Sequence, residues 1–199
     1  PVRRIEDGPD LDDLRDKLAG HRPKVFFTQS QAHNPTGGTL SPATAFGLLQ
    51  LADLHDFRIV EDDIFADLLA PTLPRLAAFG RQERVLYVGS FSKTLSASLR
   101  CGYIAGSPDL VRGLVDLKMI TTVATSAHVE RLVTDMIESG QYIKHLRRLR
   151  TRMQEGAKAT VQALSEVGLD VSLPRVQGFY LWVPLPETLD EAAFCRRAA

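Results

Sequence analysis

One lysine lies in a segment that could support covalent chemistry on a carbonyl group. Lys93 follows a short apolar run and is flanked by small residues in the sequence Gly89-Ser90-Phe91-Ser92-Lys93-Thr94. A lysine that forms a Schiff base must lose its proton, and burial helps because it disfavours the charged amine. The commoner role of a loop lysine is a solvated surface residue. If Lys93 is reactive, we expect its amine to be partly desolvated behind the strand.

Two other motifs that contain a lysine would give Lys93 a different function. A phosphate-binding Walker loop is excluded, since no glycine lies at the GxxxxGK spacing before Lys93. Ser90 and Lys93 do satisfy S-x-x-K, the acylating pair of penicillin-recognising enzymes, but the S-D-N and K-T-G elements are both absent. A serine acylase therefore stays as a third hypothesis, which labelling of Ser90 by a β-lactam would test.

Two further charged residues could act together with Lys93. Asp62 directly follows an apolar run, and a carboxylate there could pair with a pyridinium nitrogen and keep the ring an effective electron sink. The alternative for Asp62 is an acidic turn or a helix cap. Arg100 follows Lys93 and could bind a phosphate together with the hydroxyls of Ser90 and Ser92, although a surface ion pair is its commoner role.

Apolar periodicity predicts the elements that would position these residues. Helical spacing occurs in 11–19, 45–55, 108–118 and 127–167, with a break at 139–140, and in 189–197. Short apolar runs predict buried strands at 24–28, 57–60, 85–88 and 179–183, and an antiparallel or edge strand at 102–105. The expected N-cap residues are Asp10, Ser41 and Ser107. The alternation of strands and helices predicts an α/β fold with a mainly parallel sheet.

The polar clusters of the chain fall where the predicted strands end. Asn34, Asp62 and the segment from Ser90 to Lys93 each come after a different strand. In open parallel sheets, ligands bind beyond the carboxyl ends of the strands. The sequence therefore predicts one site at that edge.

Composition limits the remaining classes of protein. Of the 199 residues, 24 are Lys or Arg and 24 are Asp or Glu, so the net charge gives no sign of a nucleic-acid surface. No apolar run is long enough to span a membrane and the first residues are charged, which favours a cytoplasmic protein. The two cysteines, Cys101 and Cys195, have no metal-binding spacing and are expected to be buried thiols. The chain starts without Met, and we expect it to be a fragment of a longer protein.

The order of the motifs resembles a known family. Asn34-Pro35-Thr36-Gly37, Asp62, Ser90-x-x-Lys93 and Arg100 follow one another as in the class I/II aminotransferases of pyridoxal phosphate (PLP) fold type I. The resemblance covers nearly the whole chain. It implies a PLP-dependent transferase fold, with a partial PLP-binding large domain in 1–142 and the start of a small α+β C-terminal domain in 143–199.

The resemblance also implies a role for each matching residue. Lys93 would form the internal aldimine, the Schiff base that holds PLP, and Asp62 would pair with the ring nitrogen. Asn34 would donate a hydrogen bond to the phenolic oxygen of the cofactor, next to an Asn34–Pro35 bond that is often cis in the family. The phosphate would be bound by Ser90, Ser92 and Arg100.

One position departs from the family pattern. Three residues after the aspartate, the family usually has a tyrosine whose hydroxyl reaches the phenolic oxygen of the cofactor; this chain has Phe65. The glycine- and serine-rich phosphate loop, the ring-stacking aromatic residue and the arginine that grips the substrate carboxylate have no counterpart in these 199 residues. The contact with the phenolic oxygen would therefore depend on Asn34 alone.

The amino-acid sequence around the site is especially similar to that of one branch of transcriptional regulators. The segments 60–68 and 87–100 resemble the aminotransferase-like domain of MocR proteins, which belong to the GntR family of transcriptional regulators. In that branch the domain senses PLP or an amine, and a separate N-terminal domain, absent from these residues, binds DNA. The implied partners are an amino acid or other small amine and a second copy of the chain in a homodimer. A free-standing transaminase that moves an amino group between an amino acid and a 2-oxo acid is the alternative.

Three other features are expected to be structural. The basic run 144–152 on a predicted helix is most simply a solvated face. His33 is expected to pack within its loop beside Asn34. In the last predicted strand, Tyr180 and Trp182 are expected in the core of the small lobe.

Overall fold

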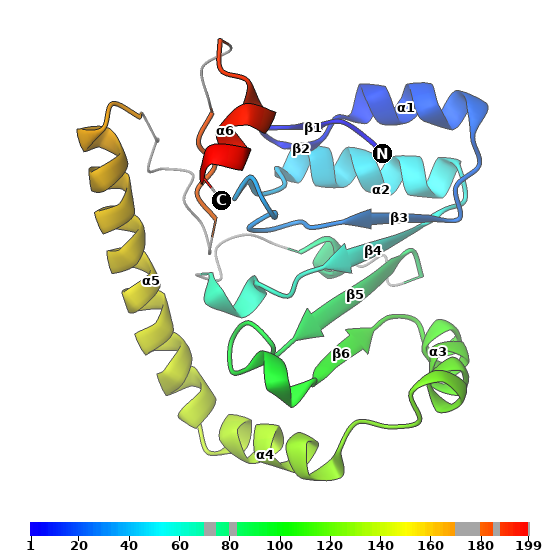
Figure 1. Cartoon of the computed structure of the whole chain (residues 1–199). Coiled ribbons are helices and arrows are strands. Elements are labelled where there is room, and N and C mark those ends of the chain that lie inside the picture. Colours follow the sequence, from blue (N-terminus) through cyan, green and yellow to red (C-terminus); the bar gives the residue numbers. More distant parts are fainter. Residues whose placement is uncertain (70–74, 80–82, 170–179, 185–187, 199) are drawn as a thin grey trace.

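The computed structural model describes residues 1–69, 75–79, 83–169, 180–184 and 188–198. Within them the sheet contains β3 (Val25–Thr28), β4 (Arg58–Asp62), β5 (Val85–Ser90) and β6 (Gly102–Ala105), in that spatial order. The first three strands are parallel and β6 is antiparallel to β5, as the sequence predicted. The fold is therefore α/β with a mixed, mainly parallel sheet (Figure 1).

Two helices cover one face of this sheet. Helices α1 (Leu11–Gly20) and α2 (Pro42–Leu54) lie side by side above the strands in Figure 1. The Asp10 side chain caps α1 by accepting from the backbone N–H groups of residues 12 and 13, and Ser41 caps α2 through residue 44. The hydrophobic core between these helices and the strands includes Leu14, Leu18, Leu48, Phe57, Ile59 and Val85.

The apolar face of α2 is only partly the one that its periodicity predicts. That periodicity places Phe46, Leu49 and Leu54 on one side; Leu49 is buried, but Phe46 and Leu54 are exposed, and Leu48 and Leu51 are buried instead. The helix is apolar nearly all round, so its periodicity alone could not select the face that meets the sheet.

The C-terminal half of the chain is mostly helical. Helices α3 (Pro108–Thr121) and α4 (Ala127–Glu138) are followed by α5 (Gln141–Glu166) and α6 (Glu191–Ala198). The predicted break at 139–140 is present, because Gly140 adopts a left-handed conformation with φ 71° before α5 begins. Ser107 occupies the N-cap position of α3 without a side-chain hydrogen bond. Cys101 is a buried thiol as expected, whereas the same expectation is wrong for Cys195, which is exposed on α6. The expected domain boundary at 142/143 lies in the first turn of α5 and stays a prediction.

The predicted strand at 179–183 is wrong where the structure describes it. Residues 180–183 have no strand assignment, and residue 179 lies outside the described residues. Trp182, expected in a core, is 56% exposed, while Tyr180 is partly buried against Phe65. A run with strand-like composition needs a neighbouring strand to pair with, and none is described beside it.

A small hairpin at the N-terminus was not predicted. Strands β1 (Arg4–Ile5) and β2 (Gly8–Pro9) pair antiparallel before α1. Gly8 has φ 126°, and a Cβ on it would lie 2.4 Å from Leu40 Cδ1, so a side chain at this position is excluded by both strain and space. Four residues are too few for periodicity to be read from the sequence.

Strand β3 lies at the edge of the four-stranded sheet. It pairs with β4 on one side, and the expectation that this strand is buried is wrong, because Val25 and Phe27 are 41% and 74% exposed. No helix in the described part of the chain is both long and apolar enough to cross a membrane.

Candidate functional site

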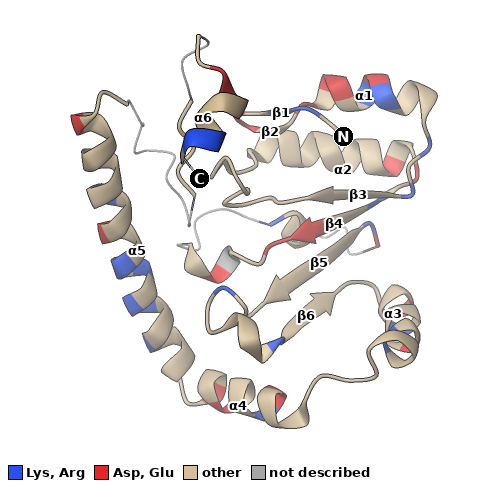
Figure 2. Ribbon diagram, viewed as in Figure 1, with Lys and Arg blue, Asp and Glu red and all other residues tan. Residues whose placement is uncertain are grey.

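The parallel strands bring the predicted polar residues to one edge of the sheet. Asp62 ends β4 and is paired in register with Val88, so it lies beside the end of β5, where Ser90 is the last residue. The loop that contains Asn34 follows β3, the neighbour of β4 on its other side. The expected clustering at the carboxyl ends of the strands is therefore seen in the structure. Figure 2 shows acidic residues at this end of β4.

A glutamine connects the Asp62 and Asn34 segments. Gln29 Nε2 donates a hydrogen bond to Asp62 Oδ2 over 3.1 Å, and Gln29 Oε1 accepts from the backbone N–H of Asn34 over 2.7 Å. Sequence reasoning missed Gln29, which is the first residue after β3. The strand register, in which Thr28 pairs with Glu61, places Gln29 next to Asp62. The sequence does not give this register, so no local pattern could have identified Gln29.

The Asn34 loop has a fixed local structure. The Asn34–Pro35 peptide bond is cis, as the family resemblance implied. His33 Nδ1 lies 2.8 Å from Thr36 Oγ1, and the backbone N–H of Gly37 donates to the His33 carbonyl over 2.6 Å. Burial, together with the nearby charge of Arg4, lowers the pKa of His33 to about 4. The expected packing of His33 within the loop agrees with these contacts.

The lysine segment forms a turn after β5. The backbone N–H of Ser92 donates to Ser90 Oγ over 3.1 Å, and the backbone N–H of Leu95 donates to the Phe91 carbonyl over 2.8 Å. The Lys93 side chain is exposed, so the partial desolvation expected of a reactive lysine is not seen among the described residues. The next residue, Thr94, is the one whose side chain is buried.

The chain then returns Arg100 to the same region. Strand β6 runs antiparallel to β5 with Gly102 opposite Ser90, and the backbone N–H of Phe91 donates to the Cys101 carbonyl over 3.1 Å. Arg100 immediately precedes this pairing and has a left-handed conformation with φ 51°. The close approach of β5 and β6 requires Gly102, because a Cβ there would lie 2.8 Å from the backbone carbonyl oxygen of Gly89.

Phe65 lies in a buried hydrophobic cluster rather than at an open surface. It is 2% exposed and packs with Ala32 of the Asn34 loop and with Leu68 and Leu69. Its ring meets the Tyr180 ring edge to face, with centroids 5.6 Å apart. The structure therefore places Phe65 between the Asn34 loop and the C-terminal segment.

Two acidic neighbours of Asp62 have structural partners. Glu61 is completely buried, and its two carboxylate oxygens accept from the backbone N–H groups of Leu76 (2.8 Å) and Ala77 (2.9 Å), at the start of the short 3-10 helix η2 (Leu76–Phe79). Asp63 Oδ2 accepts from Arg75 Nε and from the Tyr87 hydroxyl, each over 3.0 Å. Burial raises the pKa of Asp63 to about 6, although Arg75 opposes the shift.

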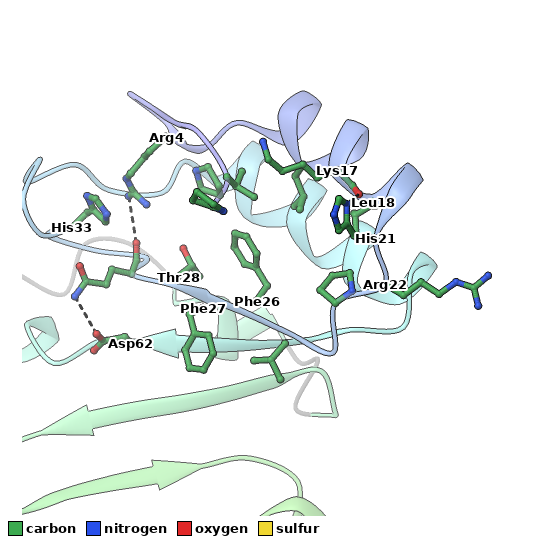
Figure 3. Close-up of a pocket in the computed structure, with 17 residues that line it drawn as sticks. Arg4, Lys17, Leu18, His21, Arg22, Phe26, Phe27, Thr28, His33 and Asp62 are labelled. Carbon is green, nitrogen blue, oxygen red and sulfur yellow. Dashed lines mark hydrogen bonds between the residues drawn. The ribbon is translucent and has the colours of Figure 1, made fainter.

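A cavity of about 950 Å³ opens beside β3 and reaches Asp62. Figure 3 shows Asp62 at one end of it, with His33 and Arg4 across from the aspartate, and His21 and Arg22 at the other end. Phe26 and Phe27 of β3 line its floor. The cavity thus connects the strand-end site with the open edge of the sheet. No group of three or more His, Cys, Asp or Glu side chains suited to a metal ion is found within the described residues.

The first turns of helix α5 pack against the lysine segment, at Thr94, and against the segment after Phe65, at Asp67. Of its basic residues, Lys144, Arg147, Arg148 and Arg152 are exposed, as expected of a solvated face (Figure 2). The same expectation is wrong for His145 and Arg150, which are partly buried. His145 Nε2 lies 2.7 Å from the Thr94 carbonyl, and Arg150 donates two hydrogen bonds to the Asp67 carbonyl. Their partners lie far away in the sequence, which is why helical periodicity did not separate them from the others.

Comparison with curated proteins gives two kinds of relative. The chain is 33% identical to the 2-aminoadipate transaminase of Thermus thermophilus over 97% of its length and 50% of that protein. It is 31% identical to YisV, an uncharacterized HTH-type transcriptional regulator of Bacillus subtilis, over 86% of its length and 36% of that protein. The chain thus spans half or less of the length of these relatives.

Comparison with solved structures and with family models agrees on the fold. The kynurenine aminotransferase of Pyrococcus horikoshii, solved with PMP, superposes with a TM-score of 0.89 at 28% identity, covering 99% of this chain and 51% of that one. LysN, an α-aminoadipate aminotransferase of Thermus thermophilus solved with N-(5'-phosphopyridoxyl)-L-leucine, gives 0.88 at 31% identity, covering 99% and 52%. The model of aminotransferase class I and II matches residues 1–198. The chain therefore belongs to the class I and II aminotransferase family and has the fold of its PLP-dependent members.

Proposed function

We propose that this chain is the PLP-binding, amine-sensing domain of a MocR/GntR-type transcriptional regulator, with Lys93 as the residue that holds the cofactor covalently. The observation that carries the PLP site is the Gln29 side chain, which ties Asp62 to the Asn34 loop at the strand ends. The regulator assignment is supported by relatives that are HTH-type regulators, among them YisV and NorG of Staphylococcus aureus.

The polar groups of the proposed site suit both ends of PLP. At one end, Ser90, Ser92 and Arg100 supply two hydroxyls and a guanidinium, which suit a phosphate dianion. At the other, the Asp62 carboxylate is held by Gln29 and suits a protonated ring nitrogen. The register of β4 and β5 brings the two ends to one edge of the sheet. When bound, PLP supplies an aldehyde carbon for an amine and a ring that accepts electrons.

Each residue then has a defined task in the proposed site. Asp62 holds the ring nitrogen in its protonated state through its negative charge, and Asn34 donates a hydrogen bond to the phenolic oxygen. Lys93 supplies the amine for covalent attachment. Phe65, which stands where relatives have a hydroxyl-bearing side chain, adds apolar contact only. The proposed partners are an amino acid or small amine, a second copy of the chain in a homodimer, and DNA through a separate domain in a cytoplasmic protein.

A transaminase is the second candidate function. It is supported by the 33% identity to the 2-aminoadipate transaminase over 97% of this chain. The two functions share the site up to capture of the amine and differ in the later steps. A transaminase releases one 2-oxo acid, passes the retained amino group to a second 2-oxo acid and so returns to its starting form, whereas a sensor stops after capture.

The covalent role of Lys93 is tested by reduction and mapping. The full-length protein is loaded with PLP, reduced with borohydride, digested and analysed by mass spectrometry. We expect the pyridoxyl group on Lys93, no label in Lys93→Ala, and wild-type labelling in Lys24→Ala, which removes an exposed lysine outside the site. A label on another lysine in the wild-type protein would refute the assignment.

A second experiment separates sensor from transaminase. The PLP-loaded full-length protein is mixed with L-2-aminoadipate and a 2-oxo acid, and product is counted per active site. We expect less than one turnover, together with a change in DNA binding to its own promoter region on addition of an amine. Many turnovers without any effect on DNA binding would establish the transaminase instead.

A further inference from the structure

Thr94, the residue after Lys93, is held by helix α5 through both its side chain and its backbone. It is 1% exposed. Its hydroxyl lies 3.0 Å from the Tyr142 hydroxyl, and its carbonyl oxygen lies 2.7 Å from His145 Nε2. A residue fixed at two points cannot shift without moving its partners, and Thr94 shares a peptide unit with Lys93.

The Tyr142 hydroxyl also contacts Asp67, which lies in the segment after Asp62 and Phe65. It lies 2.7 Å from Asp67 Oδ2. Since a carboxylate only accepts and a phenol has a single hydrogen, Tyr142 donates to Asp67, and the Thr94 hydroxyl donates to the Tyr142 oxygen. The Tyr142 hydroxyl therefore links the Thr94 hydroxyl to the Asp67 carboxylate. The Tyr142 ring packs edge to face on Phe91 of the lysine segment, with centroids 5.7 Å apart.

The same helix also binds the segment after Phe65 through a second residue, Arg150. Arg150 donates from Nε (3.0 Å) and from its terminal nitrogen (2.7 Å) to the carbonyl oxygen of Asp67. Asp67 lies in the short 3-10 helix η1 (Ala66–Leu68), directly after Phe65. Residues 142, 145 and 150 lie within the first three turns of α5. The start of α5 thus joins the lysine segment to the segment after Asp62.

We propose that Tyr142 and His145 are positioning residues for Lys93, which couple covalent attachment at this lysine to the start of helix α5. The proposal rests on the proposed function, because it assumes that Lys93 holds PLP. Covalent attachment restricts the movement of the Lys93 side chain at the strand-end site. Because Thr94 is bonded to Lys93 in the chain and hydrogen-bonded to Tyr142 and His145, the movement of these two residues is restricted as well. Helix α5 begins beside α4 and runs past the carboxyl ends of the strands (Figure 1), and its Leu149 and Met153 pack on the same buried cluster as Tyr180 of the C-terminal segment. Attachment of PLP at Lys93 would therefore change the stability of α5, and through α5 it would affect the segments that pack on this helix.

The coupling makes a prediction that a merely structural role does not. If Tyr142 and His145 only stabilised the fold, their loss would reduce protection of α5 equally with and without PLP. If they couple Lys93 to α5, their loss removes the difference between the two states. Coupling between sites is typically 5- to 150-fold in equilibrium, so roughly a fivefold effect is expected in amide exchange.

The test is hydrogen–deuterium exchange of the full-length protein with and without PLP. In the wild-type protein, PLP should slow exchange in residues 141–150 by about fivefold or more relative to helix α2, which corrects for general stabilisation by the ligand. In Tyr142→Phe and His145→Gln, that excess should fall below about twofold, given the loss of most of the coupling energy. The matched control is His128→Gln, an exposed substitution in α4, which should keep the wild-type difference.

A second pair of variants keeps the proposal testable if either α5 variant misfolds. Thr94→Val removes the hydroxyl and should lose the PLP-dependent excess, whereas Thr94→Ser retains the hydroxyl and should preserve it. Borohydride mapping is run on each sample. Labelling of Lys93 with an unchanged exchange difference in the variants, or with no PLP-dependent excess in the wild-type protein, would overturn the coupling and leave the PLP site standing. Absence of label on Lys93 in the wild-type protein would overturn both.

Discussion

The Gln29 side chain donates a hydrogen bond to Asp62 across 33 positions of sequence and, from its other end, accepts one from the backbone of Asn34. It is the contact that turns two separate strand ends into one site. A hydrogen bond to a charged group contributes about 1.5–3 kcal/mol. Gln29 is thus expected to matter for cofactor binding although it need not touch the cofactor.

Gln29→Leu should weaken PLP binding because it releases both Asp62 and the Asn34 loop. We expect the dissociation constant of PLP to rise by roughly tenfold or more, which corresponds to the loss of about 1.4 kcal/mol or more. The measurement is fluorescence titration of the full-length protein with PLP. Gln50→Leu, on the exposed side of α2, is the matched control and should bind as the wild-type protein does. Equal affinities for Gln29→Leu and the wild-type protein would show that the bridge has no role in the site.

Glu61→Ala should be the most destabilising change near the site. The Glu61 carboxylate is the acceptor for the backbone N–H groups of Leu76 and Ala77. Each of the two donors left without a partner costs about 1–3 kcal/mol, so the free energy of unfolding should fall by roughly 2–6 kcal/mol. Urea unfolding measures it. Glu83→Ala, at an exposed position, should change it by no more than about 0.5 kcal/mol. A small effect of Glu61→Ala would mean that water replaces the carboxylate.

Asp63 should make the protein less stable as the pH rises from about 4 to 6. Its pKa is about 6 in the folded state, against 3.8 for an ordinary aspartate, because the carboxyl group is buried. Between these values the folded state binds more protons than the unfolded state, so the free energy of unfolding falls with rising pH. At about 1.36 kcal/mol per pKa unit, the full effect is at most roughly 3 kcal/mol. Asp63→Asn should remove this component in urea unfolding followed over the pH range.

His33 should act in the opposite direction over nearly the same range. Its pKa is lowered to about 4 in the folded state, from 6.5. The unfolded state therefore binds more protons between these values, and the free energy of unfolding rises with pH. The wild-type profile should be comparatively flat, with Asp63→Asn rising with pH and His33→Gln falling. Parallel profiles for the two variants would contradict the opposite signs.

Phe65→Tyr should lower the pKa of the Schiff-base nitrogen at Lys93. A tyrosine hydroxyl that donates to the phenolic oxygen of PLP stabilises negative charge there, and that charge is greatest when the nitrogen has lost its proton. The measurement is a spectrophotometric pH titration of the PLP-loaded full-length protein. Phe46→Tyr adds a hydroxyl on the exposed side of α2 and should leave the pKa unchanged. Since Phe65 is buried against Tyr180, an unaltered pKa in Phe65→Tyr would mean that its ring edge faces the C-terminal segment and not the cofactor.

The sequence predicted the parts of this molecule that depend on local pattern. Strands β3 to β6, the antiparallel direction of β6, and the caps Asp10 and Ser41 all follow from apolar runs and capping residues. The gathering of Asp62, Asn34 and Ser90 at one edge follows from parallel pairing. The resemblance added the cis bond at Asn34–Pro35, which local pattern could not supply.

Contacts between distant segments could not be predicted in the same way. Gln29, Glu61 and His145 have ordinary local contexts, and their importance depends on register and on helix placement. The predicted strand at 179–183 failed for the same reason, because a strand is defined by its neighbour. The exposure of Lys93 likewise depends on the segments that pack over it rather than on the residues beside it in the sequence.

The edge position of β3 has a practical consequence for handling this polypeptide. Within the part of the chain that the structure describes, β3 pairs with β4 alone, and the Phe27 side chain is largely in solvent. Such an edge is a template for pairing with another molecule, and proteins usually protect it with charges, proline or a covering segment. When the 199-residue polypeptide is concentrated by itself, we expect self-association through strand-to-strand contact that grows with concentration. Phe27→Lys should suppress this association, as light scattering would detect, without disturbing the core on the other face of the sheet.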